Sequence, residues 1–141
     1  MSKITIPFVE NTINMPIIEF SIMGNSMIGL IDTGAELTIF DNSIINDLKK
    51  EGDMCKMGVV SLNGESPTST QKVSAVITFN SGKTKLFTRV IGYTSDLSSI
   101  SDHYHDISKD NKSIIAIFGN DILNKLDAKI DYEHKTITLY I

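Results

Sequence analysis

The stretch from Leu30 to Phe40 constrains the fold most, because it places an acid, a hydroxyl and a glycine between two apolar runs. Each apolar run predicts a buried strand. A carboxylate between such strands costs several kcal/mol to desolvate unless it is hydrogen-bonded or neutral. Gly34 suits a loop where backbone and ligand approach closely, because it has no side chain. The stretch therefore predicts two strands joined by a loop, in which Asp32 has a chemical use.

Short apolar runs separated by turn residues continue along most of the chain. They predict strands at 4–8, 17–23, 27–31, 37–40, 59–62, 73–79, 85–91, 114–119, 128–132 and 136–141. The dipeptide Asn63-Gly64 is a strong hairpin signal. Short helices are expected over 44–50, capped by Asp41 or Ser43, and over 121–126, capped by Asn120. Residues 92–113 are rich in Ser, Asp, Asn and Lys and predict a long surface loop with room for one helical turn.

The composition indicates a single globular domain over residues 1–141. Apolar residues make up 41% and charged residues 21%, and the net charge is −4. This charge, without a run of Lys or Arg, argues against a nucleic-acid partner. No 18 apolar residues run together, so no membrane span is expected. The single Cys55 and a start without a signal peptide's apolar core favour a cytoplasmic location.

The sequence Asp32-Thr33-Gly34-Ala35, preceded by two aliphatic residues, resembles the active-site loop of retropepsin-like aspartic proteases. Further matches are Thr38, the Asn63-Gly64 hairpin at the position of the family's flap, Ile117-Phe118-Gly119 before 120–123, and the closing 130–132. The resemblance covers roughly residues 14 to 140. It implies an all-β fold: the closed β-barrel that makes half of an acid protease, with a flap hairpin and one or two short helices.

The same resemblance implies an aspartic endopeptidase that needs no cofactor and acts on a polypeptide. The catalytic positions it implies are Asp32, Thr33 and Gly34. The substrate-binding positions it implies are Ala35, Glu36, Asn63, Gly64 and Ile117. Glu36 stands where the viral enzymes usually have an Asp, and the flap lacks their glycine-rich sequence.

The mechanism of this family needs two carboxylates, and the chain has one Asp-Thr-Gly. Asn80-Ser81-Gly82 has the spacing but carries an amide in place of the acid. The second aspartate must therefore come from a second copy, which predicts a two-fold homodimer. The terminal segments 4–6 and 136–141 are apolar, and we expect them to be unpaired edges that interleave across the dimer axis.

The sequence also allows other interpretations. The chain could be a catalytically silent member that keeps the fold for dimerisation or peptide binding. Asp102-His103-Tyr104-His105-Asp106 could hold a metal, but two His in a polar loop without a further ligand do not predict one. Asp121 fits a helix N-terminal charge better than a catalytic group, and Asp131 is expected to be structural.

Overall fold

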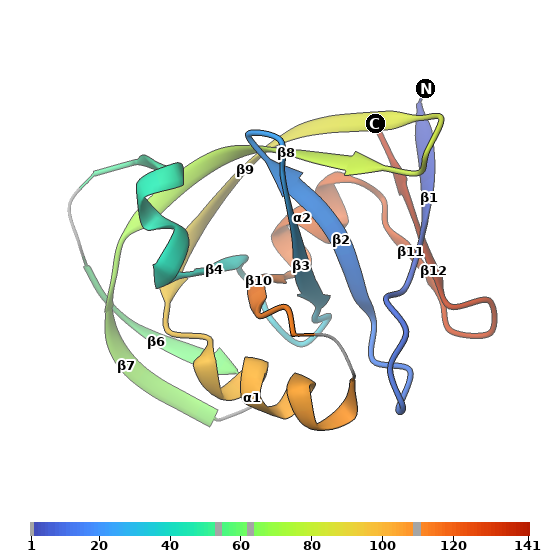
Figure 1. Cartoon of the computed structure of the whole chain (residues 1–141). Helices are drawn as coiled ribbons and strands as arrows, with labels where there is room; N and C mark the ends of the chain where they lie inside the picture. The colour runs from blue at the N-terminus through green and yellow to red at the C-terminus, as the bar shows by residue number, and fades with distance from the viewer. Residues whose placement is uncertain (1, 53–54, 62–63, 109–110) are drawn as a thin grey trace.

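In a computed structural model, the described residues are 2–52, 55–61, 64–108 and 111–141, with only the backbone described for 55–61 and 64–69. Six strands form a closed barrel, because the order β2-β3-β10-β4-β9-β8 is completed by pairing of β2 with β8 (Figure 1). They are β2 (Ile17–Ile22), β3 (Asn25–Ile31), β10 (Ile114–Phe118), β4 (Ile39–Asp41), β9 (Lys85–Ser95) and β8 (Lys72–Asn80). The short β5 (Lys49–Lys50) adds to the outer side of β8. The predicted all-β barrel is confirmed.

Two parallel pairings set the geometry of the barrel. β3 runs parallel to β10, and β4 runs parallel to β9, whereas β10 and β4 are antiparallel. As a result the carboxyl ends of β3 and β10 meet at one end of the barrel. Asp32 follows β3 and Gly119 follows β10, so the loop and the start of the last helix come together there.

The two chain termini pair with each other in a second, three-stranded sheet. Its order is β1 (Lys3–Pro7), β12 (Thr136–Tyr140), β11 (Lys129–Asp131). Ile4 lies opposite Leu139 and Ile6 opposite Ile137, and all four are at most 2% exposed. The prediction that these segments are unpaired edges is therefore wrong. Their alternating apolar residues face the core of their own chain, so these side chains are buried without a second copy.

A separate hairpin projects beside the barrel. β6 (Cys55–Ser61) and β7 (Gly64–Thr70) are antiparallel, with Ser61 opposite Gly64, so residues 62 and 63 join them. Asn63 thus lies outside the described residues. The polar segment after Gly64 forms a strand because its backbone groups bond to those of β6, and these bonds do not depend on apolar side chains.

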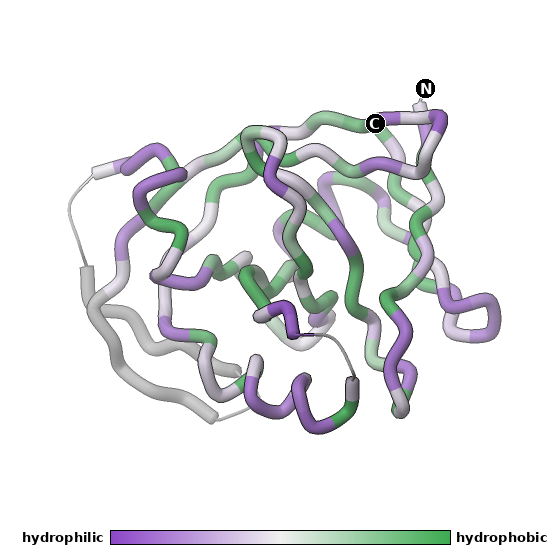
Figure 2. Tube along the Cα trace, in the orientation of Figure 1, coloured by the Kyte–Doolittle hydropathy of each residue, from purple (hydrophilic) through white to green (hydrophobic). Residues whose placement is uncertain are grey.

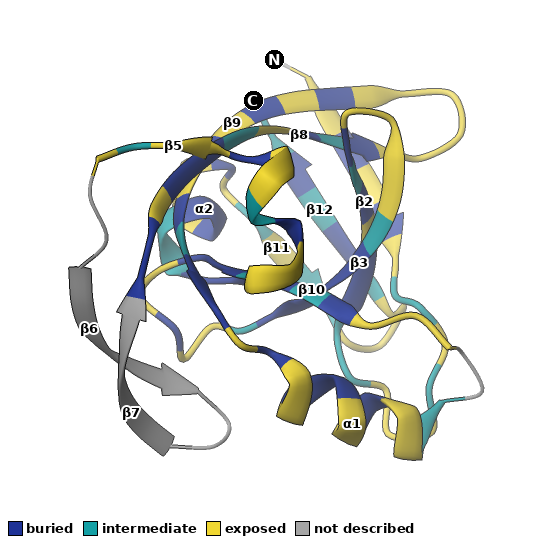
Figure 3. Cartoon of the chain, turned by 60° about the vertical axis from the view of Figure 1, so that its left-hand side comes forward, coloured by how far each residue is buried: buried dark blue, intermediate teal, exposed yellow. Residues whose placement is uncertain are grey.

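The segment 92–113, predicted as a surface loop, is largely regular structure. β9 continues to Ser95, and α1 (Ser98–Ile107) follows. Leu97, Ile100 and Tyr104 are 3%, 3% and 0% exposed, so they pack on the barrel despite the polar surroundings. Their spacing of three and four residues makes one apolar stripe, which suffices for an amphipathic helix. Figure 2 shows α1 as mostly hydrophilic, and Figure 3 shows the mixture of buried and exposed residues along it.

Two smaller helical segments complete the fold. The 3₁₀ helix η1 (Asn42–Asp47) begins after Asp41, whose Oδ2 accepts a bond of 3.0 Å from the Ser43 N–H. Asp41 is therefore the predicted cap, although the helix ends at Asp47, before the expected Lys50. α2 (Asn120–Lys125) follows Gly119. No helix in the described ranges has the length and apolarity needed to cross a bilayer.

Candidate active site

Asp32 lies at the carboxyl end of β3, in a turn that its own side chain stabilises. Its N–H donates to the Phe118 carbonyl at 3.0 Å, which extends the β3–β10 pairing by one residue. Its Oδ1 accepts from the Gly34 N–H at 2.9 Å, and its carbonyl accepts from the Ala35 N–H at 3.1 Å. Asp32 is half-buried, while Thr33 and Gly34 are exposed. The carboxylate is thus held by a backbone donor and still open to solvent, so the desolvation cost is smaller than for a buried acid.

The chain segment after β10 holds this loop from behind. The Asn120 and Asp121 N–H groups donate to the carbonyls of Ala35 and Glu36 at 2.8 and 3.1 Å. The Asn120 side-chain amide donates to the Thr33 carbonyl at 2.7 Å. The prediction that Asn120 caps α2 is wrong, because Gly119 occupies that position and the Asn120 side chain binds the loop. Three hydrogen bonds therefore fix the loop to the start of α2.

Thr38 and Asp121 form a second connection between the loop and α2. The Thr38 hydroxyl donates to Asp121 Oδ1 at 2.8 Å, and the Thr38 N–H donates to Oδ2 at 3.0 Å. The same hydroxyl accepts from the Gly119 N–H at 3.2 Å, and Asp121 Oδ1 also accepts from the Ile122 N–H at 2.8 Å. Asp121 is the first-turn acid expected from the sequence, and its carboxylate also orients the loop. The sequence held no signal for this pairing, because the two residues are 83 positions apart.

Gly119 is required by the close approach of the two segments. A Cβ at this position would lie 2.6 Å from the Leu37 carbonyl oxygen and 2.9 Å from that of Ala35. Both atoms belong to the backbone and cannot rotate away. The glycine after the apolar run of β10 therefore allows the loop to lie against α2.

The predicted substrate-binding residues are divided between the surface and the core. Glu36 is exposed in the loop next to Asp32. Ala35 and Ile117 are 8% and 2% exposed, and both belong to the apolar cluster that contains Leu97 and, in α1, Ile100. Gly64 begins β7, and Asn63 lies outside the described residues. The structure thus places Ala35 and Ile117 in the same buried apolar cluster.

Neither potential metal cluster is arranged as an enclosed site. In the described part of the chain, Asp131, Glu133 and His134 are the acid and imidazole side chains that lie close enough to share an ion, and all three are exposed. The hydrogen bond from the His134 N–H contributes most to holding the pKa of Asp131 below its usual value. The His134 imidazole, whose Nδ1 lies 2.6 Å from Asp131 Oδ2, contributes less. These bonds close the turn between β11 and β12. In the 102–106 cluster, Tyr104 is buried and His105 contacts the Lys112 carbonyl.

Comparison with known proteins supports the fold. The sequence matches no protein-family model and no curated protein. A retropepsin-like aspartic protease from Rickettsia conorii is similar in structure, with a TM-score of 0.53 and 12% identity over 99% of this chain and 90% of that one. The retroviral protease-like domain of Ddi1 from Leishmania major has a TM-score of 0.51 and 12% identity over 89% and 87%. The EIAV protease complexed with the inhibitor HBY-793 has a TM-score of 0.44 and 22% identity over 83% and 92%.

The barrel and the neighbours from Rickettsia conorii and Leishmania major together define the fold. The chain has the retropepsin-like aspartic protease fold. At identities of 12%, the likeness describes the fold and leaves the activity to be argued from the residues.

Proposed function

We propose that this chain is an aspartic endopeptidase that is active as a homodimer. The observation that carries the proposal is the Asp32 carboxylate, which is half-buried, bonded to the Gly34 N–H and fixed at the end of β3. A catalytic group must be held in place and still reach its substrate. The bonds from Asn120 and Asp121 to the loop meet the first requirement, and the exposure of Thr33 and Gly34 meets the second.

The proposed chemistry uses the Asp32 side chains of two copies. Two carboxylates about 3 Å apart cannot both ionise, so they share one proton. The ionised one removes a proton from a water molecule, which attacks the peptide carbonyl carbon. The protonated one donates its proton to the carbonyl oxygen. Collapse of the tetrahedral intermediate breaks the C–N bond: the carboxyl that took up the water proton gives it to the departing nitrogen, and the other carboxylate removes the proton of one hydroxyl, so the pair again shares one proton.

The dimer is part of this proposal because the chain has one Asp-Thr-Gly loop. Thr33 and Gly34 are exposed at the tip of the loop in a single copy. A two-fold axis beside this tip would bring the two Asp32 carboxylates together and cover the exposed tips. The terminal strands are already paired within the chain. The proposed contact therefore centres on the loop.

The proposed substrate is a polypeptide in an extended conformation. It would lie between the two Asp32 loops and the β6–β7 hairpins, whose movement would exclude water from the site. Glu36, Asn63 and Gly64 are proposed to contact it. Ala35 and Ile117 are buried, so we assign them to the floor of the binding site.

The experiment is a peptide-library cleavage assay with wild-type protein and Asp32→Asn. Asp127→Asn is the matched control, because Asp127 is exposed after α2 and its positive φ of 45° suits asparagine. The proposal expects cleavage by wild type and the control, and at least a thousandfold loss in Asp32→Asn, on the order seen when a catalytic group is removed. Cleavage that Asp32→Asn retains would refute it. Peptide binding without any cleavage would favour the silent module instead.

A further inference from the structure

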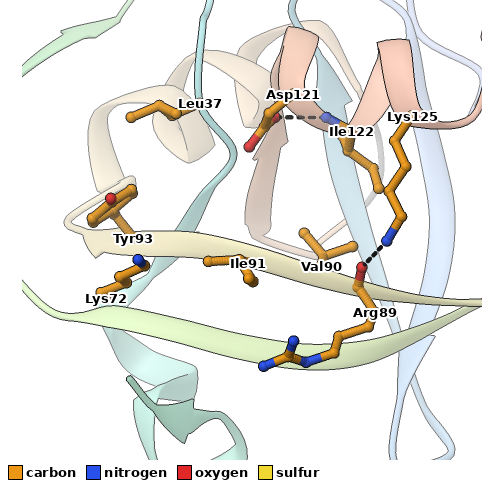
Figure 4. Close-up of a pocket in the computed structure, with 9 residues that line it drawn as sticks. All are labelled: Leu37, Lys72, Arg89, Val90, Ile91, Tyr93, Asp121, Ile122 and Lys125. Atoms are coloured by element: carbon orange, nitrogen blue, oxygen red, sulfur yellow. Dashed lines mark hydrogen bonds between the residues drawn. The ribbon is translucent and has the colours of Figure 1, made fainter. Parts of the chain in front are cut away.

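A pocket of about 350 Å³ lies between α2 and the outer side of β9 (Figure 4). Val90 and Ile122, 2% and 4% exposed, contribute to its apolar wall. Leu37 and Ile91 also line it, and they remain 36% and 44% exposed. Its volume lies at the lower end of the range for ligand sites, which is about 300–1,000 Å³.

Two lysines give the pocket positive charge. Lys72 and Lys125 line it, and neither makes an ion pair with a residue whose side chain the structure describes. The Lys125 Nζ donates one bond, of 2.6 Å, to the Arg89 carbonyl, and an ammonium group has three donors. Among the lining residues that the structure describes, Asp121 has the one carboxylate, and it is already bonded to Thr38. The chain as a whole carries −4, so this local excess of positive charge is notable.

The third cation of the pocket is neutralised. Arg89 Nη2 lies 3.0 Å from Glu51 Oε1, and Lys49 Nζ lies 3.9 Å from the same oxygen. The hydrogen bond from the Ser74 hydroxyl contributes most to holding the pKa of Glu51 below its usual value, and the two cations lower this pKa further. Arg89 is therefore engaged by an ionised carboxylate. The anion-binding capacity rests with Lys72 and Lys125.

Chain connectivity places the pocket at the edge of the candidate active site. Leu37 is five residues after Asp32, in the same loop. Lys72 is two residues after the end of β7, at the base of the β6–β7 hairpin. Figure 4 shows Leu37 and Tyr93 at one end of the pocket and Arg89 and Lys125 at the other. A polypeptide that leaves the space between loop and hairpin would pass over this pocket.

We propose that the pocket binds an acidic segment of the polypeptide substrate, several residues from the bond that is cleaved. An apolar side chain of this segment contacts Leu37 and Ile91, and a glutamate or aspartate beside it pairs with Lys72 or Lys125. This inference rests on the proposed function for the identity of the ligand. It extends that function by assigning a charge preference to a site outside the reacting centre.

The test measures binding to the Asp32→Asn protein, which leaves the pocket intact and does not consume a substrate. The probes are two fluorescently labelled octapeptides, one of alternating leucine and glutamate and one of alternating leucine and glutamine. We expect the glutamate peptide to bind about tenfold more tightly, with the difference shrinking as salt is added. Lys72→Gln and Lys125→Gln should each reduce the preference about threefold, as expected for exposed ion pairs.

Control variants separate charge from structure. Lys85→Gln removes the same charge from β9 outside this pocket, and it should keep the preference. Lys125→Arg keeps the charge and should also keep the preference for the glutamate peptide. Equal binding of the two peptides, or a preference that survives in the Lys72→Gln/Lys125→Gln double variant, overturns the inference. The proposed function fails separately, if wild type cleaves nothing in the library.

Discussion

Replacing Thr38 with valine tests how the loop is held. Valine has nearly the same shape as threonine, so the change chiefly removes the hydroxyl and its hydrogen bonds. It deletes the bond to the Asp121 carboxylate, which is worth about 1.5–3 kcal/mol as a charged hydrogen bond. It also leaves the buried Gly119 N–H without its acceptor, at a cost of about 1–3 kcal/mol. Together these predict a loss of about 2.5–6 kcal/mol in the free energy of unfolding.

The assay is urea unfolding at matched protein concentrations, because dimerisation would make stability depend on concentration. With a slope of about 2 kcal/mol per molar urea, the midpoint should fall by about 2 M. Thr38→Ser is the control, since it keeps the hydroxyl and loses one methyl group, worth about 1 kcal/mol. If the valine variant were no less stable than the serine variant, the hydrogen bonds would not be what holds the loop.

Three other substitutions test the remaining contacts. Gly119→Ala should cost about 3 kcal/mol and reduce any cleavage, because its Cβ would lie 2.6 Å from the Leu37 carbonyl; unchanged unfolding would contradict this. Ile100→Ala should cost about 3 kcal/mol and Ser99→Ala almost nothing, if α1 is an integral part of the core. Glu51→Gln should destabilise the protein at neutral pH. This difference should shrink as the pH falls below 4.5, the usual pKa of Glu51, because its folded-state pKa is lowered; a difference independent of pH would refute the assignment.

The barrel was predictable because its strands alternate with clear turn signals. The run before Asp32 and the run before Gly119 are apolar, β-branched and bounded by glycine, and both form strands of the barrel. The Asp-Thr-Gly sequence likewise identified the loop. In this chain, the local sequence pattern shows where strands begin and end.

The features that were missed depend on contacts between distant parts of the chain. α1 looked like a loop because three apolar residues sufficed to bury one face of a polar helix. The terminal strands looked like interface edges because sequence pattern cannot distinguish a partner in the same chain from one in another copy. The role of Asn120 was misassigned for the same reason, since its acceptor, the Thr33 carbonyl, is 87 positions away.

These contacts also determine where the predicted site residues lie. The structure places Asp32, Thr33, Gly34 and Glu36 in one loop, and Ala35 and Ile117 in one buried apolar cluster. That arrangement is compatible with the proposed roles and leaves them as proposals. The bonds from Asn120 and Asp121 that hold the loop in place were not anticipated from the sequence.

The most direct test of the central claim is a subunit-mixing experiment. Wild-type protein and Asp32→Asn are unfolded together, refolded at a fixed total concentration, and assayed on a peptide that wild type cleaves. If each site needs one Asp32 from each copy, random pairing at equal amounts leaves about a quarter of the dimers active. Activity should then follow the square of the wild-type fraction. Activity that stays proportional to the amount of wild-type chain would contradict a site shared between two copies.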